Sequence, residues 1–298
     1  MGLKIENIKK SYGTKLVVNN ISFEMDKPGV FGLLGTNGAG KTTIIRMTLG
    51  IIKKDEGTIL WNGKEVTRKN VNFGYLPEER GIYPKTKIYN QLMYFAKLKG
   101  MKKIDADESI KYWTKRLEVD EYVHMTAEKL SKGNQQKVQF ITAVMHNPEL
   151  IVLDEPFSGL DPVNTELLKG VMLELIEKGK YVIMSSHQMV TIEEFCTDLI
   201  ILDRGKSVLQ GNLMKIKNSY PSNSVEIITT EDIAEIIKEC KLSIKSAKDN
   251  SYIVGIKDEE EGFKLHKELS KNNINVIKFE IKKPSLNDIF IEKVGDAR

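Results

Sequence analysis

Residues 35–42 read GTNGAGKT, and this short stretch decides the fold. It fits the pattern G-x-x-x-x-G-K-[ST], and it lies between an apolar strand-like run and a helix-like run. Glycines at such a turn let backbone N–H groups surround phosphate oxygens, and the helix N-terminus adds positive potential. The stretch therefore predicts a nucleoside triphosphate site, with Lys41 reaching the β- and γ-phosphates and Thr42 binding Mg²⁺.

A second signal is the acidic pair in LIVLDEP, residues 150–156, at the end of an apolar run. Asp154 can hold Mg²⁺ through water, and Glu155 can accept a proton from an attacking water. Two solvated acids at a strand end are the plain alternative, but the phosphate loop favours the catalytic interpretation. No N-K-x-D motif follows, so ATP is favoured over GTP.

The pattern around these motifs predicts an α/β fold. Residues 1–30 alternate weakly, as in a small antiparallel sheet, whereas ELIVLDEP and KYVIMSSH read as buried parallel strands. From about 87 to 130 the apolar period becomes helical. We expect a RecA-like P-loop NTPase core over residues 1–217, with an antiparallel β subdomain and a helical insert.

The stretch NSYPSN, residues 218–223, reads as a linker. Residues 222–298 then follow the order strand, helix, strand, strand, helix, strand, with a last short helix after Pro284. This order predicts a small α+β domain of the ferredoxin-like βαββαβ type, without an active-site motif.

The composition argues against a disordered chain and against a membrane-spanning chain. Hydrophobic residues make up 41% and charged residues 29%, which is typical of a folded globular protein. The net charge of +4 suits a phosphate ligand or an acidic membrane surface, although a solvated basic surface is the more ordinary explanation. The pattern of residues 1–10 has no apolar signal core, and no apolar run approaches the length of a membrane span, so we expect any membrane part to be another chain.

Over residues 3–215 the order of motifs resembles the ATP-binding cassette (ABC) family. LSKGNQQK, residues 130–137, resembles its signature motif, usually Leu-Ser-Gly-Gly-Gln, and SGLDP resembles its D-loop. SSH ends in His187 at the switch-histidine position, GYLPEERG occupies the Q-loop position, and Tyr12 lies where the family stacks an aromatic ring on adenine.

The resemblance implies two cassettes packed head to tail around ATP and Mg²⁺. Ser131, Gly133 and Asn134 of one chain would face the nucleotide held by the other, and His187 would contact phosphate. Glu155 and His187 are the expected catalytic residues, and Thr42, Asp154 and Glu78 the expected Mg²⁺ residues. The remaining expected nucleotide contacts are Tyr12, Gly35, Asn37, Gly38, Ala39, Gly40, Lys41 and Thr43.

Three positions depart from the family pattern. Lys132 and Asn134 replace the usual glycine and glutamine of the signature, and Glu78 replaces the Q-loop glutamine. A glutamate can bind Mg²⁺ but, when ionised, cannot donate a hydrogen bond. We therefore expect Glu78 to keep a metal-sensing role. Ser131 alone could also be an ordinary helix N-cap.

The ending KPSLNDIFIEKVG and the stretch GYLPEERGIYP resemble bacterial export ATPases, including the sodium-extruding NatA type. The resemblance implies an ATPase subunit, expected as a homodimer at the cytoplasmic face of the membrane with separate permease subunits. It would export sodium ions, drugs or peptides, and no nucleic-acid partner is expected. The alternatives are a soluble ABC ATPase acting on nucleic acid or ribosomes, and a non-catalytic regulatory module.

Overall fold

The computed structural model describes residues 2–67, 70–79 and 81–296. By contacts the chain divides into two compact units, Met1–Gln210 and Gly211–Arg298. Of the expected Q-loop stretch, Arg80 lies outside the described residues, and so does the chain end at 297–298.

The centre of the first unit is a six-stranded sheet in the order β10-β9-β3-β8-β7-β6. Its strands are β3 (Gly29–Gly35), β6 (Phe73–Leu76), β7 (Leu150–Asp154), β8 (Tyr181–Ser186), β9 (Asp198–Asp203) and β10 (Lys206–Asn212). The strands from β9 to β6 pair in parallel. Helices cover both faces of such a sheet, so its strands are buried and mainly apolar. Strand β7 is accordingly buried throughout and apolar up to Asp154, as its continuous hydrophobic run predicts.

A second sheet, in the order β2-β1-β4-β5, confirms the antiparallel β subdomain. Its strands are β1 (Leu3–Tyr12), β2 (Lys15–Met25), β4 (Glu56–Trp61) and β5 (Lys64–Glu65). One apolar core joins this sheet to β3 and to α1 (Lys41–Thr48), the helix that follows the phosphate loop. Burial of this core fixes the loop between the two sheets.

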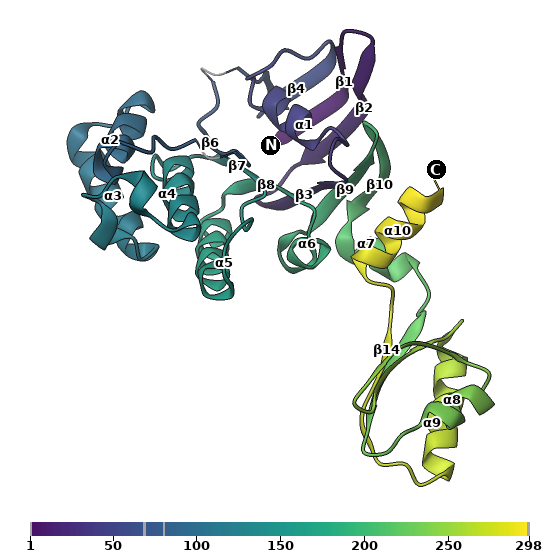
Figure 1. Cartoon of the computed structure of the whole chain (residues 1–298). Helices are drawn as coiled ribbons and strands as arrows, with labels where there is room; N and C mark the ends of the chain where they lie inside the picture. Colours follow the sequence, from purple (N-terminus) through teal and green to yellow (C-terminus); the bar gives the residue numbers. More distant parts are fainter. Residues whose placement is uncertain (1, 68–69, 80, 297–298) are drawn as a thin grey trace. The chain divides into compact units, whose positions relative to one another are not determined.

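The helical insert contains α2 (Ile88–Leu98), α3 (Lys103–Arg116), two short 3₁₀ turns (Asp120–Tyr122 and Ala127–Lys129) and α4 (Lys132–Val144). Helices α2 to α4 lie beyond β6 and β7, on the opposite side from β1, β2 and β4 (Figure 1). Ile110, Trp113 and Leu117 are buried, as their helical spacing predicts. Helices α5 (Pro162–Glu177) and α6 (Met189–Phe195) complete this unit.

The second unit contains α7 (Leu213–Ser219), β11 (Ser224–Thr229), α8 (Ala234–Glu239), β12 (Ser243–Lys248), β13 (Ser251–Gly255), α9 (Glu259–Lys271), β14 (Val276–Lys282) and α10 (Leu286–Asp296). From β11 to β14 the element order is the predicted βαββαβ, in an antiparallel sheet ordered β12-β13-β11-β14. Helix α7 belongs to this unit by contacts, although it begins before the expected boundary at 217.

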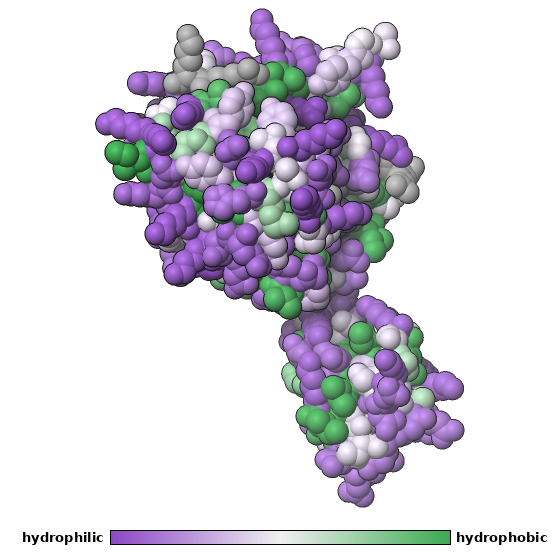
Figure 2. Space-filling model, turned by 60° about the vertical axis from the view of Figure 1, so that its left-hand side comes forward, coloured by the Kyte–Doolittle hydropathy of each residue, from purple (hydrophilic) through white to green (hydrophobic). Residues whose placement is uncertain are grey.

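No helix among the described residues is long and apolar enough to cross a bilayer. The face that brings the helical insert forward is mainly hydrophilic, with separate hydrophobic patches (Figure 2).

Candidate functional site

The phosphate loop joins β3 to α1, as predicted. Gly40 caps α1 with φ 105°, and a Cβ there would lie 2.9 Å from the carbonyl oxygen of Val17, so only glycine fits easily. Lys41 is 7% exposed, and its Nζ donates to the carbonyl oxygens of Gly35 at 2.7 Å and Thr36 at 3.3 Å. The loop thus holds a nearly buried cation at a helix N-terminus, which favours an anionic ligand.

A cavity of about 240 Å³ opens at this loop and contains two of the expected carboxylates. Its lining is Val17, Thr36, Asn37, Gly38, Gly40, Lys41, Thr42, Thr43, Glu78 and Glu155. Most of the expected nucleotide contacts are therefore brought together. Ala39 is buried behind the loop, and Tyr12 does not line the cavity but stands half exposed, with Lys10 Nζ 5.6 Å from its ring.

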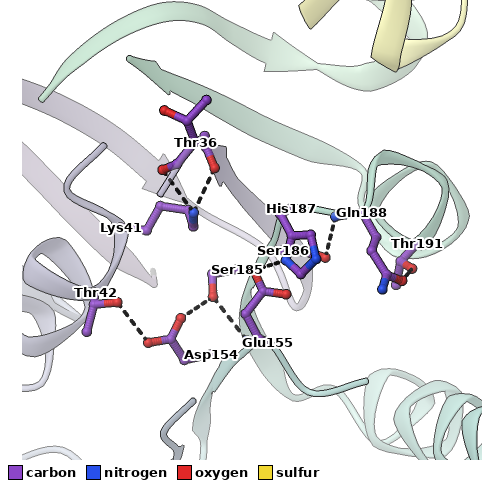
Figure 3. A network of polar contacts seen from close by, with 11 residues as sticks. Thr36, Lys41, Thr42, Asp154, Glu155, Ser185, Ser186, His187, Gln188 and Thr191 are labelled. Atoms are coloured by element: carbon purple, nitrogen blue, oxygen red, sulfur yellow. Dashed lines mark hydrogen bonds and ion pairs between the residues drawn. The ribbon is translucent and has the colours of Figure 1, made fainter. Parts of the chain in front are cut away.

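The acidic pair reaches the loop from the neighbouring part of the sheet (Figure 3). The Thr42 hydroxyl donates to Asp154 Oδ2 at 3.1 Å, and the Ser185 hydroxyl makes a short hydrogen bond to Asp154 Oδ1. Asp154 is 1% exposed, so these contacts satisfy a buried carboxylate. Sequence reasoning missed Ser185, although it is the first residue of the SSH motif that ends in the switch histidine.

Glu155 is the strained residue of the site. Its φ of 53° is left-handed, which is unfavourable for a residue with a Cβ. Its backbone N–H donates to the carbonyl oxygen of Ser185 at 3.2 Å, and its Oε1 lies 2.9 Å from Nδ1 of His187 (Figure 3). Strain of this kind persists where surrounding contacts hold it, often at functional sites. The carboxylate is aimed at the phosphate cavity and has a basic partner.

Thr42 and Asp154 also suit a magnesium ion. A hydroxyl oxygen and a carboxylate oxygen 3.1 Å apart are hard oxygen ligands of the kind that Mg²⁺ prefers. The described residues contain no cluster of three or more acidic, histidine or cysteine ligands, so such an ion would need nucleotide oxygens and water to complete its shell.

The expected signature residues lie at the N-terminus of α4 and do not line the phosphate cavity of their own chain. Ser131 is the N-cap, and its hydroxyl oxygen accepts the Asn134 backbone N–H at 3.2 Å. The ordinary capping use of this serine is therefore present, and its hydroxyl hydrogen stays available to donate. Gly133 is buried beside Leu160 and Asn164.

The tip of the β9–β10 hairpin supports the phosphate loop from behind, a contact that sequence reasoning missed. The Gly205 N–H donates to the Ala39 carbonyl at 3.1 Å, and the Gly205 carbonyl accepts the Asn19 N–H at 2.8 Å. The link of this turn to a loop more than a hundred residues earlier has no local signal in the sequence.

These features define a P-loop nucleoside triphosphatase: a phosphate loop with its lysine, a hydroxyl–carboxylate pair suited to Mg²⁺, and a glutamate–histidine pair, all on a parallel sheet. Comparison with known proteins identifies the family within this class. The family model described as ABC transporter matches residues 18–158, and the model described as ATP-binding protein DrrA1-3-like, C-terminal domain, matches residues 211–294.

Two relatives match this chain in sequence over nearly its whole length. The uncharacterized ABC transporter ATP-binding protein YhaQ of Bacillus subtilis is 43% identical over 98% of both chains. The linearmycin resistance ATP-binding protein LnrL of the same species is 30% identical over 98% of both. A solved ATP-binding subunit of an ABC transporter has a TM-score of 0.68 at 27% identity, covering 74% of this chain and 93% of that one. This chain belongs to the ATP-binding subunits of the ABC transporter family, which are ATPases.

Proposed function

We propose that this chain is the ATP-hydrolysing subunit of an ABC exporter, working as a head-to-tail homodimer with two Mg–ATP between the cassettes. The observation that carries the proposal is an incomplete site. The phosphate loop, Glu78 and Glu155 line one cavity, whereas Ser131 and Gly133 lie elsewhere in the same chain. A second copy would complete each site. One structural neighbour is a dimeric bacterial ABC transporter cassette, which supports a dimer.

Each residue has a role that follows from its chemistry. Lys41 and the loop N–H groups would bind the phosphates, with Gly35 and Ala39 shaping the loop and Tyr12 stacking on adenine. Thr42 and Asp154 would hold Mg²⁺, which supplies charge neutralisation when bound. Glu155 would take a proton from water, and His187 would orient Glu155 and contact phosphate. Ser131, Gly133 and Asn134 would bind the partner's nucleotide.

Export through separate permease subunits at the cytoplasmic face of the membrane is the transport role that we propose. The relatives include the linearmycin resistance protein LnrL and the lipopolysaccharide export protein LptB of Haemophilus influenzae, which is 30% identical over 72% of this chain and 92% of its own. The resistance relative makes a drug-like molecule the first cargo to assay. The surface that meets the permease would lie between Glu78 and Phe95, where the Q-loop meets the helical insert. Nothing in the site favours the nucleic-acid alternative.

One experiment tests the ATPase part. Glu155→Gln keeps the size of the side chain but removes the base, so it should hydrolyse ATP at least a hundredfold more slowly, within the range usual for a lost general base. With ATP and Mg²⁺ it should form a stable dimer in light scattering. Hydrolysis at the native rate would exclude Glu155 as the base.

A second experiment tests the transport part. The tagged chain, purified from detergent-solubilised native membranes, should bring a multi-span membrane protein in fixed stoichiometry. Recovery with ribosomes or nucleic acid only would overturn the transporter assignment.

A further inference from the structure

Helix α4 carries three glutamines whose side-chain amides each hold the backbone of a different loop. Every one of these bonds runs from a glutamine Nε2 to a backbone carbonyl oxygen. The acceptors are Ala127 and Leu130 for Gln135, Pro156 for Gln136, and Pro77 and Glu79 for Gln139. The helix that begins with the signature serine is thus tied to the loop before it, to the exit of the acidic strand and to the Q-loop.

Gln139 is the most informative of the three because its two acceptors flank Glu78. Its Nε2 lies 3.1 Å from the Pro77 carbonyl oxygen and 3.0 Å from that of Glu79. Two facing acceptors identify this end of the amide as the nitrogen. Gln139 is 2% exposed, so these bonds are sheltered from water. Glu78 itself lines the phosphate cavity together with Lys41.

Gln139 also lines a groove of about 1100 Å³. The groove contains Pro77 and Gly81 from the Q-loop region, Phe95, Leu98 and Lys99 from the end of α2, and Tyr75 from β6. Gln139 Oε1 is buried and has no hydrogen-bond partner among the described residues. A buried acceptor without a donor is costly, so the two hydrogen bonds of Nε2 are what hold the amide in place.

We propose that Gln139 is the positioning residue of the Q-loop: it sets the place of Glu78 at the phosphate cavity. The proposal rests on the proposed function, because the Mg²⁺ role of Glu78 belongs to the proposed ATPase site. The two carbonyl groups belong to the residues on either side of Glu78, so a change in the orientation of the amide moves the backbone that carries Glu78.

The first test compares Gln139→Met with Gln135→Met, which removes the same kind of amide contact from the same helix. Amide hydrogen exchange of the nucleotide-free chain should rise at residues 78–79 in Gln139→Met and at 127–130 in Gln135→Met, without crossing over. Gln139→Glu, which keeps the size but cannot donate when ionised, must act in the same direction as Gln139→Met. Native exchange at 78–79 in both Gln139 variants overturns the proposal.

The second test separates positioning from mere structural support. Losing two hydrogen bonds should raise the Mg²⁺ concentration for half-maximal ATP hydrolysis roughly tenfold in Gln139→Met. Glu78→Ala should shift it in the same direction, and the double variant should be no worse than Glu78→Ala alone. Gln135→Met should keep the native Mg²⁺ dependence. Additive effects, or a native Mg²⁺ dependence in Gln139→Met, overturn the proposal.

Discussion

Substituting Gly205 should disturb the nucleotide site although this residue touches no expected ligand. Gly205 has φ 79°, and a Cβ there would collide with the carbonyl oxygen of Val17. Gly179 is a matched control, because it has φ 75° and open space around the position of a Cβ. Gly205→Ala and Gly179→Ala therefore share the cost of the left-handed backbone and differ in the collision.

The expected magnitudes follow from these contacts. Left-handed backbone costs alanine about 1–2 kcal/mol, partly offset by the reduced entropy of the unfolded chain, so Gly179→Ala should lose about 1 kcal/mol. In Gly205→Ala the tip must also move, which weakens its two backbone hydrogen bonds to Ala39 and Asn19. At about 1 kcal/mol each, these bring the expected loss to about 3 kcal/mol.

Urea unfolding followed by tryptophan fluorescence measures this difference in the first unit alone, because Trp61 and Trp113, the two tryptophans of the chain, both lie there. Since the Gly205 N–H holds the Ala39 carbonyl, Gly205→Ala should also raise the KM for ATP roughly tenfold, whereas Gly179→Ala should not. Equal losses of stability in the two variants, with equal KM for ATP, would show that the hairpin tip does not support the phosphate loop.

Three further predictions concern single side chains. Ser131→Asp keeps an N-cap acceptor but adds a negative charge, so it should unfold like the native chain yet lose ATP-induced dimerisation. Ser131→Ala should lose dimerisation and also about 1 kcal/mol of stability. Dimerisation of Ser131→Asp would contradict the contact of Ser131 with the partner's nucleotide. Glu78→Gln should hydrolyse ATP nearly as well as the native chain and Glu78→Ala clearly less well, measured over a range of Mg²⁺; native behaviour of Glu78→Ala would make Glu78 a surface acid only. Burial lowers the pKa of His146 to about 4, so the folded chain binds fewer protons than the unfolded chain between that pH and about 6.5. The contribution of His146 to the free energy of unfolding is complete above pH 6.5 and is lost as the pH falls towards 4, about 3 kcal/mol in all. Urea unfolding of the native chain and of His146→Gln at about pH 7 and pH 4 measures it, and the same change of stability with pH in both chains would refute it.

Contiguous motifs made the nucleotide half of the site predictable. The phosphate loop needs a strand, glycines and a helix in immediate succession, so Lys41 and Thr42 could be placed from the sequence. Asp154 and Glu155 follow an apolar run and could be placed at a strand end. The Thr42–Asp154 contact, however, joins residues 112 apart, and it depends on the order of strands in the sheet.

The amino-acid sequence by itself determined the fold class, the nucleotide chemistry and the two-part layout, because these depend on local periodicity and on residue types in short motifs. Only the tertiary structure decided which residues far apart in the sequence are joined by hydrogen bonds to the backbone. Gln139 holds carbonyl groups some sixty residues earlier, and Gly205 holds a loop still farther back. Such bonds leave no local pattern, because a buried amide or a turn glycine is placed by the packing of the whole sheet and its helices.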